Sequence, residues 1–136
     1  MKYSLLIPVK IESLANKMEH WSKRHKRNKI LKFLIQRELS VNNVPSLPCI
    51  ERSQGERVKV ALTRIAPRSL DSIDNLPSSM KPVIDAIADF FLPGLKAGRA
   101  DADQRFEFML MQEKGKPKEY GLRIEIIFEK DQSVCF

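Results

Sequence analysis

Large side chains alternate with polar ones along the last regular segment of the chain, and this alternation constrains the fold most strongly. They recur at every second position: Tyr120, Leu122, Ile124, Ile126 and Phe128. A period of two places such residues on one face of a β-strand. The sequence therefore predicts a strand over 120–130, and the fold is expected to contain a sheet with a buried face.

Three further segments have the character of strands. Residues 3–11 are apolar and β-branched, residues 57–66 alternate apolar with polar side chains, and residues 106–112 form another short run. Residues 113–119 contain Gly115 and Pro117, so they are expected to join the last two strands as a hairpin loop.

Two segments follow a helical period instead. In residues 16–39 one apolar stripe is formed by Leu31, Leu34, Ile35 and Leu39. In residues 80–91 the stripe is formed by Val83, Ile84, Ile87, Phe90 and Phe91. Because proline is tolerated only in a first turn, the second helix is expected to begin near Ser79 with Pro82 in that turn. The intervening residues 40–56 are predicted to be a long connection.

The order strand, helix, strand, helix, strand, strand predicts an α+β protein. A single domain over residues 1–136 is expected, with a mixed sheet of about four strands and two main helices packed on it. No apolar run reaches 18 residues, so no membrane span or membrane partner is expected. Cys49 and Cys135 suggest neither a metal site nor a disulfide framework, which favours the cytoplasm.

The formal net charge of +7 favours an anionic partner such as nucleic acid. Basic residues gather in one stretch: Lys17, Lys23, Arg24, Lys26, Arg27, Lys29, Lys32 and Arg37. Glu19 is the one acidic residue among them. Charge that serves solubility alone is the alternative interpretation.

Carboxylates gather after the second strand and before the third. Asp71 and Asp74 follow the former, and Asp101 and Asp103 precede the latter. If these strands are neighbours, the four side chains can converge and hold Mg²⁺, which prefers oxygen ligands, with Mn²⁺ as an alternative. Helix capping by Asp71 or Asp74, and turn positions for the other two, are the competing interpretation.

The series Asp71, Asp74-Asn75-Leu76, Lys81, Asp85 and Asp101 resembles the RusA family of Holliday junction resolvases, especially its phage-borne members. Residues 13–16 followed by His20-Trp21 are similar to the family's N-terminal turn and helix, and residues 115–126 are similar to its C-terminal hairpin. The chain departs from the family pattern at three points. Asp71 and Asp74 are spaced more widely, Ala100 stands where many relatives have aspartate, and Pro82 lies in the helix.

The resemblance implies a homodimeric, magnesium-dependent endonuclease that cuts branched DNA and needs no small-molecule cofactor. Asp71, Asp74, Lys81 and Asp101 match the family's catalytic positions, and Asp103 lies beside them as a further metal ligand. An ammonium such as that of Lys81 can stabilise charge that develops on a phosphate, although a lone helix lysine is otherwise a solvated one. The DNA-binding residues are expected to be Asn16, Lys23, Arg24, Lys26, Arg27 and Lys29.

Two rival interpretations remain. In one, the chain is a nucleic-acid-binding module without catalysis, the carboxylates cap helices, and the basic helix is the functional element. In the other, the chain is a structural or interaction protein and its charge is incidental.

Overall fold

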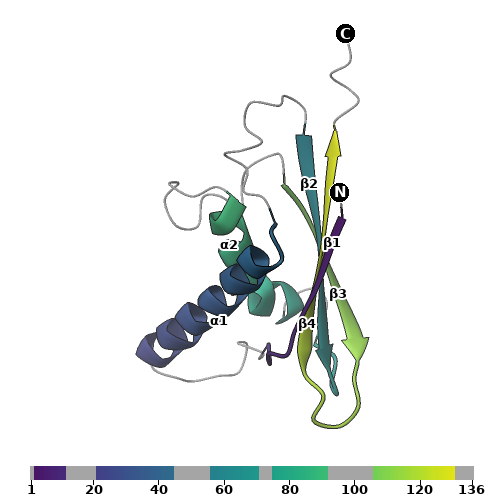
Figure 1. The fold of residues 1–136 in the computed structure, drawn as a ribbon. Helices are drawn as coiled ribbons and strands as arrows, with labels where there is room; N and C mark the ends of the chain where they lie inside the picture. Colours follow the sequence, from purple (N-terminus) through teal and green to yellow (C-terminus); the bar gives the residue numbers. More distant parts are fainter. Residues whose placement is uncertain (1, 12–20, 45–55, 71–74, 92–105, 131–136) are drawn as a thin grey trace.

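The computed structural model describes residues 2–11, 21–44, 56–70, 75–91 and 106–130. Along the chain the elements are β1 (Lys2–Ile7), α1 (Trp21–Val41), β2 (Glu56–Ala66), α2 (Asn75–Phe91), β3 (Phe106–Lys114) and β4 (Gly121–Lys130) (Figure 1). Among the described residues this order confirms the α+β class, with a mixed sheet of four strands and two helices.

The strands lie in the order β1-β4-β2-β3. Strand β4 pairs antiparallel with both β1 and β2, whereas β2 and β3 are parallel. The predicted hairpin between the last two strands is therefore wrong, because β2 lies between them. The connection after β3 crosses the end of β2, where the Gly115 N–H donates to the Ala66 carbonyl at 2.9 Å.

Burial explains the central place of β2. Val58, Val60 and Leu62 are almost completely buried on its inner face, and Thr63 and Ile65 are buried on the other face. A strand with apolar side chains on both faces is more stable at the centre of a sheet than at its edge. At the centre both faces are covered and both edges are hydrogen-bonded to neighbouring strands. A hairpin preference between consecutive strands does not outweigh that burial.

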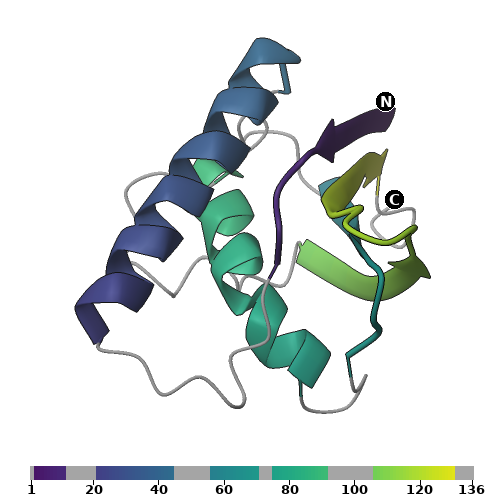
Figure 2. The same ribbon diagram turned by 90° about the horizontal axis from the view of Figure 1, so that it is seen from below.

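Both helices cover one face of the sheet (Figures 1 and 2). The core lies between them and the inward positions of the strands. Its largest fully buried side chains include Ile35, Leu39, Met80, Ile87, Phe91, Leu62, Leu122, Ile124 and Ile126. The inward alternation predicted for β4 is confirmed at its three central positions, which are fully buried.

Helix α1 buries a narrow stripe formed by Leu31, Ile35 and Leu39. It ends at Val41, two residues beyond the predicted end. Asn43 takes a left-handed conformation with φ 58°, and the Val44 N–H donates to the Leu39 carbonyl at 3.0 Å. A second bond joins the Asn43 N–H to the Ser40 carbonyl, so the helix ends in a Schellman motif.

Helix α2 begins at Asn75, four residues before the predicted start, and Pro82 lies in its interior. The proline of the first turn is Pro77, whose missing N–H needs no helical partner there. Pro82 deprives the Ser78 carbonyl of its usual donor, which weakens the helix locally. Deep burial of Met80, Val83 and Ile87 compensates by holding this helix against the sheet.

An aromatic cluster fixes the end of α2. The Phe91 ring lies 5.8 Å from that of Phe106 and 5.9 Å from that of Phe128, centroid to centroid. Tyr3 of β1 makes an edge contact with Phe128 at 5.9 Å. The end of α2 therefore lies over the start of β3, and α2 runs in the opposite direction to β2 and β3.

Candidate nucleic-acid interface

The exposed side of α1 is strongly basic. Seven of its residues are Lys or Arg and one is acidic, Glu38, near its end. The cationic residues are Lys23, Arg24, Lys26, Arg27, Lys29, Lys32 and Arg37. Because Leu31, Ile35 and Leu39 occupy the buried stripe, the charged side chains spread over the remaining surface of the helix.

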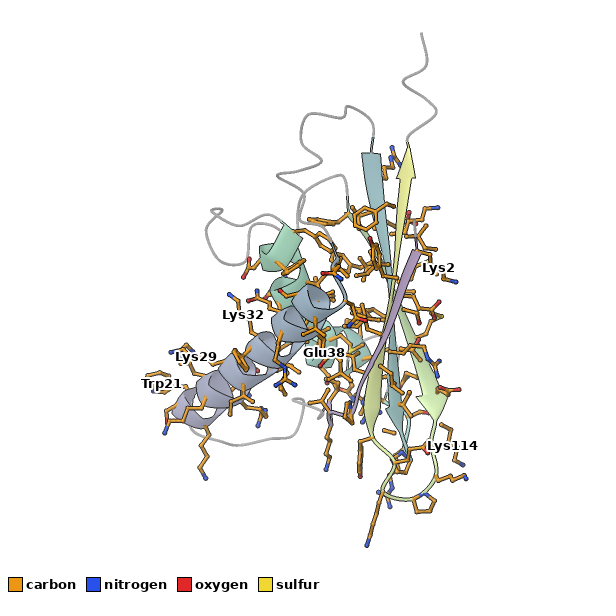
Figure 3. The ribbon with its side chains drawn as sticks, viewed as in Figure 1. Lys2, Trp21, Lys29, Lys32, Glu38 and Lys114 are labelled. Atoms are coloured by element: carbon orange, nitrogen blue, oxygen red, sulfur yellow. The ribbon has the colours of Figure 1, made fainter. Side chains whose placement is uncertain are left out.

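Three of these lysines have no ion-pair or hydrogen-bond partner among the described residues: Lys23, Lys26 and Lys29. All three are exposed. Figure 3 shows Lys29 and Trp21 projecting from α1 on the side away from the sheet. Unpaired ammonium groups along one helix form a surface suited to the phosphates of a nucleic acid backbone.

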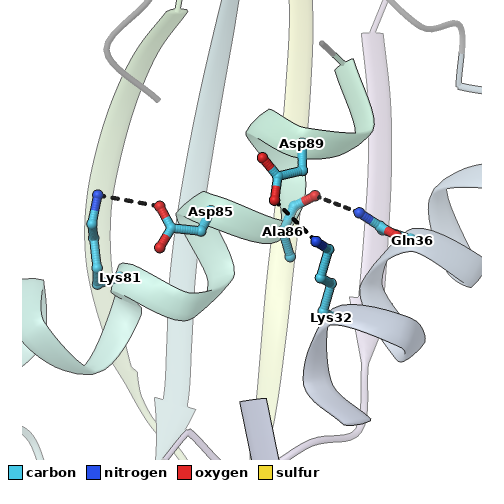
Figure 4. Close-up of polar contacts among 6 residues, drawn as sticks. All are labelled: Lys32, Gln36, Lys81, Asp85, Ala86 and Asp89. Atoms are coloured by element: carbon cyan, nitrogen blue, oxygen red, sulfur yellow. Dashed lines mark hydrogen bonds and ion pairs between the residues drawn. The ribbon is translucent and has the colours of Figure 1, made fainter. Parts of the chain in front are cut away.

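Lys32 is used differently, because it ties the two helices together (Figure 4). Its Nζ bonds Asp89 Oδ2 of α2 at 3.0 Å. One turn further along α1, Gln36 Nε2 donates to the Ala86 carbonyl at 3.2 Å. These contacts fix how α1 lies on α2, and therefore fix the direction in which the basic face points.

Lys81, a predicted catalytic residue, lines a groove between the two helices together with Lys32 and Asp89. Its Nζ is 3.2 Å from Asp85 Oδ1, one turn along α2, and its side chain is 52% exposed (Figure 4). The Asp85 oxygen of this ion pair is itself buried, so Lys81 compensates its charge, and a phosphate would have to compete with Asp85 for the ammonium.

The predicted metal ligands Asp71, Asp74, Asp101 and Asp103 lie outside the described residues, as does Asn16. Their convergence stays a prediction. One described neighbour bears on it. Helix α2 begins at Asn75, directly after Asp74, which keeps the capping interpretation of Asp74 open.

The strand directions limit how Asp71 and Asp74 could share one metal site with Asp101. β2 and β3 are neighbours as supposed, but they are parallel, so Ala66 pairs with Lys114 and Val58 with Phe106. The end of β2 and the start of β3 are therefore about 26 Å apart at 3.3 Å per residue. Asp101 precedes Phe106 by five residues, which extend at most about 18 Å. A common site thus requires residues 101–105 to return along the sheet toward the end of β3.

Two polar side chains hold the segment that leads to Asp71. Arg64 Nε donates to the Ile11 carbonyl at 2.9 Å, and Nη1 donates to the Arg68 carbonyl at 2.8 Å. The Gln112 amide bonds both backbone groups of Leu70, accepting from its N–H at 2.6 Å and donating to its carbonyl at 2.7 Å. Burial lowers the pKa of Arg64 below its ordinary value, and Tyr120 acts in the opposite direction.

Sequence reasoning did not identify Arg64 or Gln112. A signal was present, because position 64 continues the inward series 58, 60, 62 and position 112 continues the series 106, 108, 110. A charged or amide side chain at an inward position must find polar partners. It therefore marks a place where irregular backbone meets the sheet.

No known family model matches the chain, and no curated protein matches it. Neither described helix is both long and apolar enough to cross a membrane. Within the described ranges, no three His, Cys, Asp or Glu side chains gather as a metal site would need.

Replacing Arg64 by methionine should lower the free energy of unfolding by about 2 to 3 kcal/mol, because two carbonyls lose donors that carry charge. The matched control is Arg57→Met, an exposed position on the same strand, which should change stability little. Urea denaturation of both variants measures the difference. Equal losses in the two variants would contradict the role assigned to Arg64.

Proposed function

We propose that the protein binds branched DNA through the basic face of α1 and cleaves it as a magnesium-dependent endonuclease. The observation that carries the binding half is the set of exposed lysines Lys23, Lys26 and Lys29, which have no partner among the described residues. The cleavage half rests on the resemblance of the Asp71 to Asp103 region to RusA resolvases.

The basic face supplies contacts to phosphates and not to base edges. Lysine is a point charge on a flexible stem, so it fits phosphates in several positions. Such contacts position a duplex without reading its sequence. This suits a nuclease that selects DNA by shape.

In the proposed enzyme, Asp71, Asp74 and Asp101, with Asp103 nearby, would hold the metal. Mg²⁺ bound there would activate a water and stabilise the leaving oxygen. Lys81 would leave Asp85 for the scissile phosphate and stabilise the charge that develops on it. Arg64 and Gln112 contribute by holding residues 68–70, directly before the first carboxylate.

A homodimer is part of the proposal, because a two-fold dimer presents two identical sites to a four-way junction. The described surface has apolar side chains that could form such an interface: Phe33 and Val41 are 64% and 67% exposed on α1. Sedimentation velocity at micromolar concentration should show a species of about twice the 15.7 kDa chain mass. A monomer that does not change when junction DNA is added would contradict the dimer.

The second candidate is a nucleic-acid-binding module without catalysis. It is favoured by the start of α2 at Asn75, which suits a capping role for Asp74, and by the separation between the end of β2 and the start of β3. In this candidate the basic face has the same role, so only the cleavage assay separates the two.

Replacing Lys23, Lys26 and Lys29 together by glutamine should weaken binding to every DNA alike. Each lost phosphate contact should reduce the slope of log K against log salt by about 0.9, so the slope should fall by about 2 to 3. The control, with the same change in net charge, replaces Lys114, Lys116 and Lys118, which are exposed at the end of β3 and in the loop that follows it, and which do not belong to α1. Fluorescence anisotropy at several salt concentrations compares them, and equal slopes would place the DNA elsewhere.

Replacing Asp74 by asparagine separates cutting from binding. In the proposed enzyme, cleavage of a mobile synthetic four-way junction in Mg²⁺ should fall by orders of magnitude, while binding persists or tightens because a negative charge is lost. Asparagine caps a helix about as well as aspartate, so folding stability should not change. If variant and parent cleave equally, Asp74 is not in the active site, and if neither cleaves in Mg²⁺ or Mn²⁺, the second candidate is favoured.

A further inference from the structure

A pocket of about 370 Å³ lies beside the basic face, between α1, the start of α2 and the segment that follows β1. Ile11, Leu31 and Ser79 line it and are themselves buried at 4%, 9% and 3% exposure. Ile30, Leu34 and Pro82 add further apolar lining. Its volume lies within the range of pockets that bind small organic groups.

One buried polar side chain of this lining, Ser79, lacks a hydrogen-bond partner among the described residues. The atom concerned is Oγ, which is itself buried. A buried hydroxyl without a partner costs about 1 to 3 kcal/mol, so such groups are rare in folded proteins. Because Ser79 lines the pocket, rotation of its side chain would let a bound molecule with a hydrogen-bonding edge supply the missing partner.

Cations surround the apolar lining. Lys10, Lys23, Lys26 and Arg27 all border the pocket. Three of the four belong to α1, so the phosphate-binding face and the pocket share side chains. A ligand with a flat apolar body, hydrogen-bonding edges and an attached phosphate matches this arrangement.

We propose that this pocket receives one unpaired nucleobase of the bound DNA, while Lys23, Lys26 and Arg27 hold the phosphates on either side of it. The inference rests on the proposed function, in that the DNA lies on α1. Apolar side chains would contact the faces of the base and Ser79 would bond its edge, as in sites that accept extruded bases. An unpaired base at a branch point enters at the lowest cost, because no pair has to be broken.

A fatty acid is the main rival occupant, and two observations disfavour it. Its alkyl chain would lie against Ser79 Oγ and leave that hydroxyl unsatisfied. It would also carry one negative charge, whereas the cations continue along α1 well beyond the pocket, as a polyanion requires. The fatty acid is therefore an outcome of the test.

The experiment uses a short single-stranded oligodeoxynucleotide that carries one 2-aminopurine, and the same strand paired in a duplex. Anisotropy measures affinity. Stacking on neighbouring bases quenches 2-aminopurine emission, so the emission rises when the base leaves the stack and enters a pocket whose described lining residues are not aromatic. The parent protein should raise the emission of the single strand and not that of the duplex. Binding without this rise would overturn the pocket assignment and leave the proposed function standing, whereas no binding to any DNA would overturn both.

Two variants and a matched control locate the base. Ser79→Ala should weaken single-strand binding about fivefold, the worth of one hydrogen bond, with duplex affinity unchanged and thermal stability equal or higher. Leu34→Trp fills the pocket and should abolish the emission rise, whereas Met109→Trp, at an exposed position of β3 outside the lining, should not. Identical behaviour of the two tryptophan variants would overturn the proposal. The proposal would also be overturned if no base enters the pocket and dodecanoate binds saturably to the parent protein but not to Leu34→Trp.

Discussion

The pairing of β2 with two different neighbours is the interaction on which the rest of the structure depends. Its antiparallel edge bonds β4 and its parallel edge bonds β3, so every other strand is attached to it directly or through β4. The parallel edge requires a crossover, which is supplied by α2. Since α2 in turn carries α1, the direction of the basic face follows from the place of β2.

The contact between the helices sets the orientation of the basic face of α1. Lys32 and Gln36 of α1 bond Asp89 and the Ala86 carbonyl of α2, and the stripe centred on Ile35 is buried beneath them. These contacts use the side of α1 that faces α2 and leave Lys23, Lys26 and Lys29 exposed. One helix therefore contributes to the core, to the interhelical contact and to the proposed phosphate surface through different sides.

Charge and cavity lie next to each other at the same end of α1. Lys23 and Lys26 of the proposed phosphate surface also border the pocket that Ser79 lines. In the proposed complex, the cations would contact phosphates with little selectivity, and the pocket would select an unpaired base by its shape. For a protein that recognises branched DNA, the second contact would distinguish an unpaired nucleotide from the regular duplex around it.

The sequence by itself determined the elements and the faces they bury. The period of two in 120–130 predicted the buried Leu122, Ile124 and Ile126, and the helical stripe predicted the buried Leu31, Ile35 and Leu39. These signals are local, because each depends on side chains a few residues apart. The basic face was predictable for the same reason.

Only the tertiary structure decided the sheet order, the early start of α2 and the clamp formed by Arg64 and Gln112. Strand order depends on how much surface each strand buries in the complete sheet. The local sequence around Gly115 and Pro117 does not contain that information. The start of α2 at Asn75 depends on packing that offsets Pro82, a long-range effect. Arg64 bonds Ile11, which is 53 positions away along the chain, because folding brings an inward-facing cation to irregular backbone that local pattern cannot identify.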